Sequence, residues 1–179
     1  MATPPLEVSA THVLRRSSRQ PQIVGYGNGE VRPQNNITRA EVATIFFRLL
    51  TDDVRDENLT KTNRYSDVAA TSWYNTAVSP LSSMGIITGY PDGTFGPQRD
   101  ITRAETMTLV NRILNRQPET EDDLFPNMTV WTDNANPKAW YYLAVQEATN
   151  SHYYKFKTNS KYEKWTELRE TRDWTQLEK

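Results

Sequence analysis

Apolar residues recur at helical spacing in four stretches of this chain. Intervals of three and four positions, which mark one face of a helix, are found near residues 39–51, 73–84, 103–115 and 138–150. The apolar positions of the first and third stretches are Val42, Ile45, Phe46 and Leu49, and Met107, Val110, Ile113 and Leu114. The pattern predicts four helices, each with one buried face.

A Trp-Tyr pair stands at the start of the second stretch and two residues into the fourth. The apolar faces of these stretches are Trp73, Ala77, Leu81 and Met84 in one, and Trp140, Leu143, Ala144 and Ala148 in the other. Because each tryptophan leads such a stripe, we expect its ring to pack into the core. Stacking of the ring on a sugar is the alternative that the same position allows.

Two of the helix starts carry the T-x-x-E pattern of a capping box. Thr38 with Glu41, and Thr102 with Glu105, place a hydroxyl and a carboxylate three positions apart at the front of a helix. In a capping box these two groups bind backbone amides that the helix leaves free. This role explains both glutamates, so we expect neither to be catalytic.

The chain repeats itself at a fixed distance. The run GYGNGEVRPQNNITRAE at residues 25–41 returns as GYPDGTFGPQRDITRAE at residues 89–105. We call residues 25–32 and 89–96 the first and second glycine loops. A weaker match joins Tyr65-Ser66-Asp67 and its Trp-Tyr pair to Trp131-Thr132-Asp133 and its own pair. Asp67 and Asp133 precede helices, where we expect them to cap turns.

The ends of the chain show no such pattern. Residues 1–22 are polar and aperiodic, so we expect them to be disordered. Residues 153–179 mix charged and aromatic side chains, and we expect a last helix around residues 162–172.

The composition narrows the function classes further. A net charge of −1 provides no basic surplus for nucleic acid. No apolar run approaches the roughly 20 residues of a membrane span, and residues 1–20 lack the apolar segment of a signal peptide. Cysteine is absent, and His12 and His152 stand apart from other catalytic groups. We therefore expect no catalytic residue, no metal and no cofactor.

Taken together, the runs YSDV, WY, MGIITGYPDGTFGP and ITRAE resemble an S-layer homology repeat. The resemblance covers residues 65–114 as a complete repeat, 24–50 as the second half of another and 131–150 as the first half of a third. It implies a mainly α fold of tandem helix-loop-helix repeats with short turns and little strand. The expected divisions are a disordered segment 1–22, a partial repeat 23–60, a complete repeat 61–120, a partial repeat 121–152 and a tail 153–179.

The resemblance also implies a function. Modules of this family occur on exported bacterial proteins and bind anionic, often pyruvylated, cell-wall polysaccharide without catalysis, which places them at the cell surface. Their ligand groove uses the ITRAE arginine and the glycine loop. Carried over to this chain, the ligand-binding residues are Arg39, Arg103, Asp92, Gly93, Tyr90 and Trp73. A guanidinium fork and free turn amides suit a ketal carboxylate, and an aromatic ring suits a sugar face.

The two glycine loops differ in the residues that form the turn. The first has Gly27-Asn28 where the second has Pro91-Asp92, so we expect Arg103 to matter more than Arg39 for binding. For both arginines the alternative is a structural salt bridge to a neighbouring glutamate.

Two other functions stay open at this point. The chain could join proteins to one another, completing its half-repeats by self-association. A polysaccharide-acting enzyme would need two carboxylates in unlike environments. The repeated carboxylates all have a capping or turn explanation, so the sequence favours binding over catalysis.

Overall fold

The computed structural model describes residues 33–170. The chain divides into two compact units, Met1–Thr102 (unit 1) and Arg103–Lys179 (unit 2). Over the described range it has five α-helices and one two-stranded sheet, which confirms a mainly α protein with little strand. None of these helices is both long and apolar enough to span a membrane. The disorder expected for residues 1–22 lies outside the described residues.

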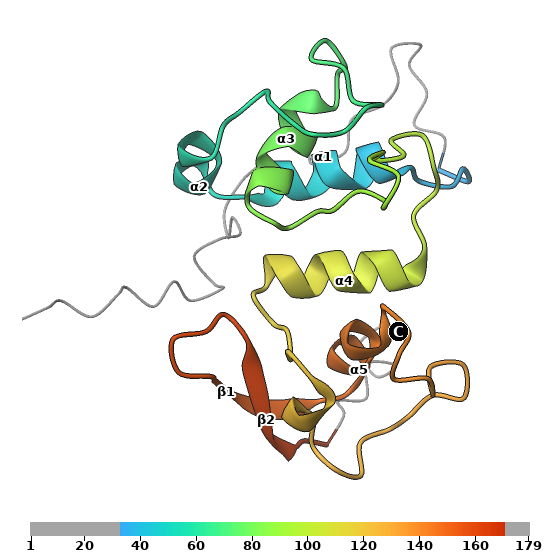
Figure 1. The fold of residues 1–179 in the computed structure, drawn as a ribbon, viewed down its shortest axis with the longest axis vertical. Coiled ribbons are helices and arrows are strands. Elements are labelled where there is room, and N and C mark those ends of the chain that lie inside the picture. Colours follow the sequence, from blue (N-terminus) through green and yellow to red (C-terminus); the bar gives the residue numbers. More distant parts are fainter. Residues whose placement is uncertain (1–32, 171–179) are drawn as a thin grey trace, which may run out of the picture. The chain divides into compact units, whose positions relative to one another are not determined.

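Unit 1 is built on two helices that pack side by side, α1 (Arg39–Leu49) and α3 (Asn75–Ser83), with the short α2 (Asp52–Glu57) after α1 (Figure 1). Small side chains let the two main helices approach closely. The fully or nearly fully buried positions in this core include Ala40, Ala43, Leu50, Ala77, Val78, Leu81 and Phe95. Of the apolar face predicted for α1, Val42 is buried and Ile45, Phe46 and Leu49 are half-buried.

The capping box predicted at the start of α1 is present. The Thr38 hydroxyl accepts from the backbone amide of Glu41, and the Glu41 carboxylate accepts from the amide and the hydroxyl of Thr38. Helix α4 begins at Arg103, so the predicted start just after Thr102 is also confirmed.

A buried asparagine fixes the long loop before α3. The Asn75 amide nitrogen donates to the carbonyls of Lys61 and Ala70, while its oxygen accepts from Asn63 and Ser79. The side chain is almost fully buried and satisfied in both halves. This network therefore holds the loop that carries residues 64–67 against the helix.

The prediction that the two tryptophans pack into the core is wrong. Trp73 is 61% exposed and Trp140 is 66% exposed. Helices α3 and α5 begin at Asn75 and Tyr142, so each tryptophan lies before its helix and outside the buried stripe. Each indole instead meets the next tyrosine edge-on, at centroid distances of 5.3 and 5.4 Å.

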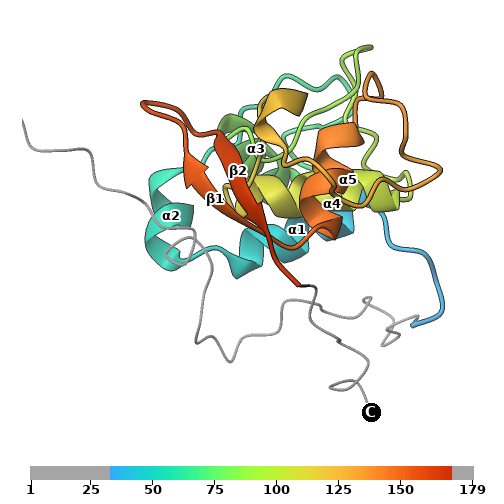
Figure 2. The same ribbon diagram turned by 90° about the horizontal axis from the view of Figure 1, so that it is seen from below.

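Unit 2 packs a second helix pair, α4 (Arg103–Ile113) and α5 (Tyr142–Thr149), with the short 3₁₀ turn η2 (Glu121–Asp123) between them in sequence. The hairpin of β1 (His152–Phe156) and β2 (Glu163–Leu168) follows α5 and is seen beside it in Figure 2.

The face of α5 that is buried differs from the predicted one. The buried side chains are Tyr142, Gln146 and Glu147, whereas Leu143 and Ala144 are half-buried and Ala148 is exposed. Glu147 is buried on this face because it meets Arg116, His152 and Trp165, while the side-chain oxygen of Gln146 accepts from Asn150.

The helix expected around residues 162–172 is wrong. Residues 163–168 form the second strand of the antiparallel hairpin, with Tyr154 opposite Trp165 and Phe156 opposite Glu163. Burial alternates along this strand: Glu163 and Trp165 are buried and Lys164 and Thr166 are exposed. That period of two, together with aromatic and β-branched residues, is the signature of a half-buried strand.

Loss of the α1 cap should destabilise unit 1 without disturbing other contacts. We expect Thr38→Ala to lower the free energy of unfolding by about 0.5–2 kcal/mol, because an amide at the helix start loses its acceptor. Thr38→Ser keeps the hydroxyl and should restore most of the loss in urea denaturation. Thr62→Ala, at an exposed position, is the matched control. Equal stability of Thr38→Ala and Thr62→Ala would contradict this role.

Candidate functional site

The second glycine loop is held in place by a carboxylate far away in the sequence. The backbone amides of Phe95 and Gly96 donate to the two oxygens of Asp67, at 2.7 and 2.8 Å. Free turn amides of this kind can bind an external anion, but here the Asp67 carboxylate already accepts both hydrogen bonds. The expectation that Asp67 caps its own turn is wrong, because its partners lie in the other half of the repeat.

Arg39 holds the same loop from α1. Its Nε donates to the Phe95 carbonyl at 2.9 Å and one terminal nitrogen donates to the Thr88 carbonyl at 3.1 Å. Its guanidinium carbon lies 4.8 Å from the ring centres of both Tyr90 and Phe95. The side chain is only 8% exposed, so Arg39 positions the loop rather than presenting a charge at the surface.

Glycines are required at two points of the loop. A Cβ on Gly89 would lie 2.3 Å from the Thr94 carbonyl and 2.5 Å from the Tyr65 ring. Gly93 has a φ of +82°, where other residues are strained. The loop therefore lies tightly on the aromatic ring beneath it.

Asp92 closes the turn on itself. Its carboxylate accepts from the amide and the hydroxyl of Thr94 at 2.9 and 2.6 Å. These hydrogen bonds, and the charge of Arg99, lower the pKa of Asp92. Asp92 is therefore a fixed anion at the exposed tip of the turn.

A pocket of about 440 Å³ opens between this loop and the segment before α3. Its lining is Arg64, Tyr65, Gly89, Tyr90, Pro91 and Gly93. Arg64 is exposed and makes no ion pair within residues 33–170, and its guanidinium lies 5.8 Å from the Tyr65 ring centre. A cation thus lies beside the Tyr65 ring and shares the pocket with Tyr90 of the glycine loop, whose shape is fixed.

The structure brings only part of the predicted site together. Tyr90 and Gly93 line the pocket, and Asp92 lies in the turn between them. Arg39 lies against Tyr90 but is buried. Trp73 is exposed and is not among the lining residues, and Arg103 belongs to unit 2.

Sequence reasoning missed Arg64. It could have been found from its position directly before Tyr65-Ser66-Asp67, the motif whose Asp67 binds the second glycine loop.

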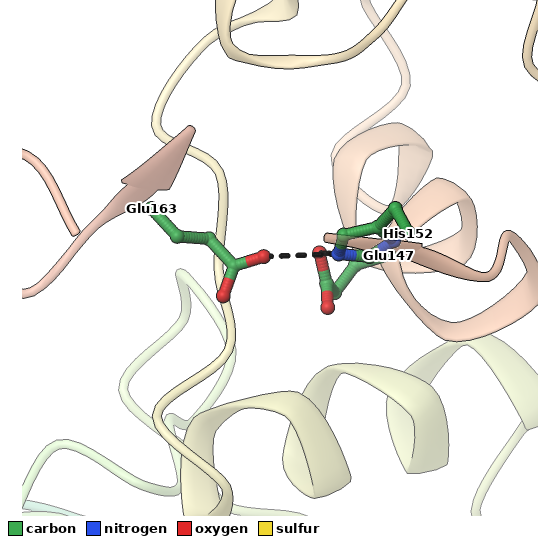
Figure 3. A group of neighbouring side chains, drawn as sticks. All are labelled: Glu147, His152 and Glu163. Atoms are coloured by element: carbon green, nitrogen blue, oxygen red, sulfur yellow. Dashed lines mark hydrogen bonds and ion pairs between the residues drawn. The ribbon is translucent and has the colours of Figure 1, made fainter. Parts of the chain in front are cut away.

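Unit 2 contains a separate charged cluster. Glu147 on α5, His152 on β1 and Glu163 on β2 have ligand atoms within 4.8 Å of one another (Figure 3). Oxygen and imidazole groups of this kind can bind a metal ion. Here Arg116 already neutralises them: its Nε lies 2.6 Å from Glu163 and a terminal nitrogen lies 3.0 Å from Glu147. Two carboxylates and two cationic side chains balance, so a divalent cation would have to displace Arg116.

The imidazole of His152 is held between both glutamates. Burial lowers its pKa, but hydrogen bonds to Glu147 and Glu163 outweigh this effect and raise the pKa to about 9. Burial in turn raises the pKa of Glu163, while hydrogen bonds from His152 and Arg116 lower it more. The Trp165 ring stacks on the imidazole at 3.9 Å, so the cluster joins the hairpin to α5.

In the sequence, His152 stands apart from other charged or catalytic groups, but in the fold it contacts Glu147 and Glu163. Its partners lie at distant positions that no local spacing reveals.

A family model described as S-layer homology domain matches residues 23–43 and 64–107 of this chain. Among curated proteins, "Cell surface glycoprotein 1" of Acetivibrio thermocellus is 32% identical over 86% of this chain and 7% of its own length. "Cellulosome-anchoring protein" of the same organism is 38% identical over 54% of this chain and 22% of its own. "Surface layer protein" of Brevibacillus choshinensis is 30% identical over 71% of this chain and 11% of its own. The matches thus span less than a quarter of each relative.

The cluster predicts how the stability of unit 2 depends on pH. The folded pKa of His152 lies above the ordinary value of 6.5, so its contribution is complete below pH 6.5 and is lost as the pH rises through about 9. We expect a loss of at most about 1.4 kcal/mol per pH unit in that window. The lowered pKa of Glu163 acts oppositely: its contribution is present above 4.5 and is lost as the pH falls.

Urea titrations across the alkaline window check this dependence. His152→Gln should remove the slope, whereas His12→Gln, at the other histidine of the chain, should keep it. If the free energy of unfolding of His152→Gln still falls as the pH rises through this window, a group other than His152 causes the dependence.

Proposed function

The chain belongs to the S-layer homology family, and on this premise we propose that it is a non-catalytic anchoring module that binds anionic cell-wall polysaccharide. Such binding holds the protein that carries the module at the cell surface. The names of the relatives, with their surface-layer and anchoring proteins, support this assignment.

The observation that carries the proposal is the free guanidinium of Arg64 at the pocket of unit 1. A guanidinium presents a planar, always charged fork that matches a carboxylate with two hydrogen bonds. Pyruvate ketals on a sugar supply such a carboxylate. The neighbouring Tyr90 and Pro91 offer apolar surface to the sugar ring. We therefore assign Arg64 to the anion and Tyr90 to the sugar.

The other residues of the loop act by positioning these two. Asp67 binds the backbone of the loop from the first half of the same repeat, and Arg39 binds it from the preceding partial repeat. Gly89 and Gly93 allow its close approach and its turn. In this assignment Arg39 contributes to affinity through the shape of the loop.

Binding is favoured over catalysis by the chemistry of the pocket. Acid–base cleavage of a glycosidic bond needs two carboxylates in unlike environments. The residues that line this pocket are cationic, aromatic or backbone groups, and the nearby Asp67 and Asp92 are engaged by amides. Release of new reducing ends from purified wall polymer would overturn the non-catalytic assignment.

The ligand class is tested by sedimentation of the protein with native cell walls and with walls from which the pyruvate has been removed chemically. The protein should co-sediment with the native walls and be largely released from the treated ones. Equal binding to both would show that the ketal carboxylate is not the recognised group.

Removal of the free cation should weaken binding specifically. We expect Arg64→Ala to raise the dissociation constant for wall polymer by about tenfold to a hundredfold, because hydrogen bonds to charged groups contribute about 1.5–3 kcal/mol. Arg64→Lys should rescue only part of this loss. Lys61→Ala, an exposed cation outside the pocket, is the matched control in calorimetric titration. Equal losses in Arg64→Ala and Lys61→Ala would contradict the assignment.

A further inference from the structure

The β-hairpin of unit 2 has two unlike faces. His152 and Trp165 lie on one of them, where their rings stack at 3.9 Å within the charged cluster. We call this the inner face. Successive side chains of a strand point to opposite faces, so Tyr153 and Lys155 of β1 and Lys164 of β2 belong to the other, outer face.

Two lysines lie directly opposite each other on the outer face. Lys155 of β1 pairs with Lys164 of β2 in the antiparallel register. Side chains at directly opposed positions have Cβ atoms about 4.5–5.5 Å apart, and like charges at such positions repel each other. Both lysines are exposed and make no side-chain hydrogen bond or ion pair within residues 33–170. The hairpin thus presents two neighbouring positive charges to the solvent.

A third cation and an aromatic ring extend this face. The guanidinium carbon of Arg169 lies 4.8 Å from the ring centre of Tyr153, which is 52% exposed. The Arg169 amide donates to the Ser151 carbonyl at 2.8 Å, so the backbone holds this arginine beside the hairpin. Glu167, opposite Tyr153, adds one carboxylate. Three cationic side chains against this carboxylate leave an excess of positive charge.

Two other cations of the hairpin have counter-charges within the fold. Lys157 lies 2.6 Å from Glu119 and 3.1 Å from Asp123. His152, on the inner face, lies between the two glutamates of the cluster. The charges of the outer-face lysines are instead screened by ions of the solvent, which an anion with several charges can displace.

We propose that the outer face of the hairpin is a second contact surface for the anionic wall polysaccharide, in addition to the pocket of unit 1. The inference rests on the proposed function, because it takes the same polymer as the ligand. Lys155 and Lys164 bind carboxylates of the polymer. The Tyr153 ring, held by Arg169, contacts the apolar side of a sugar.

The chemistry of this face favours a polysaccharide over a lipid surface. A segment that binds a membrane surface combines cations with apolar side chains that enter the lipid. Along β1 and β2, the positions that strand alternation assigns to the outer face hold no aliphatic side chain. A polar face with one exposed ring matches a chain of hydroxyl and carboxylate groups.

A charge reversal tests this surface without weakening the hairpin. Lys164→Glu places a carboxylate opposite Lys155, so repulsion becomes attraction and the free energy of unfolding in urea should not fall. Calorimetric titration of the full chain with wall-polymer fragments should nevertheless show a dissociation constant about threefold to twentyfold higher. Lys138→Glu, at an exposed lysine of unit 2 outside the hairpin, makes the same change in net charge and is the matched control. Equal affinities of the two variants overturn the proposal.

Nuclear magnetic resonance on the Arg64→Ala chain separates this surface from the pocket of unit 1. With the pocket cation removed, the amide signals of Lys155 and Lys164 should still shift as wall-polymer fragments are added. If the pocket signals of Gly89 and Tyr90 shift in the unmodified chain while the hairpin signals do not, this inference is wrong and the proposed function stands. If vesicles of anionic phospholipid shift the hairpin signals and polymer fragments do not, the surface binds lipid and the inference is also wrong.

Discussion

The contact between the Asp67 carboxylate and the amides of Phe95 and Gly96 is the interaction on which unit 1 depends. The glycine loop has few apolar side chains of its own, and only Phe95 is buried deeply. Such a loop cannot be held by apolar burial alone, so its backbone is bound directly. Asp67 binds the amides on one side and Arg39 binds the carbonyls on the other. The two charged groups thereby define the shape of the loop, and with it the pocket beside Arg64 and Tyr90.

In unit 2 charged side chains hold a different element, the β-hairpin. Within the described residues it has a similar helix pair, but a β-hairpin that contacts Glu147 of α5 follows where unit 1 has a glycine loop after α3. Buried ion pairs are costly unless each charge is also hydrogen-bonded. Here the carboxylates of Glu147 and Glu163 accept from Arg116 and His152, and the Trp165 indole donates to Glu147 at 2.9 Å. A charge-balanced cluster therefore holds the hairpin on α5.

The helices were predictable because their signals are local. The capping box at Thr38 and Glu41 and the helical spacing that follows define α1 within a dozen residues. The tryptophans were misjudged because the helix starts two residues after each of them, a shift that rotates the side chain off the buried face. The hairpin was missed because residues 163–168 read as a charged stretch until their partner strand is known.

The site was less predictable because several of its contacts join residues that are far apart in the sequence. Glycine positions and the turn at Asp92 follow from local rules, whereas the roles of Asp67, Arg39 and Arg64 depend on pairing across the repeat. The partners of Asp67 lie about thirty residues further on. No spacing rule within one helix or turn reports such contacts, and the same holds for His152 and Glu163.

The central claim is that the second glycine loop binds the wall polymer. Nuclear magnetic resonance on the isotopically labelled full chain, titrated with polymer fragments, tests it most directly. We expect the amide signals of Gly89, Tyr90 and Gly93 and the side-chain Nε signal of Arg64 to shift together and to saturate. Shifts confined to unit 2, with these four signals unmoved at saturating polymer, would contradict it.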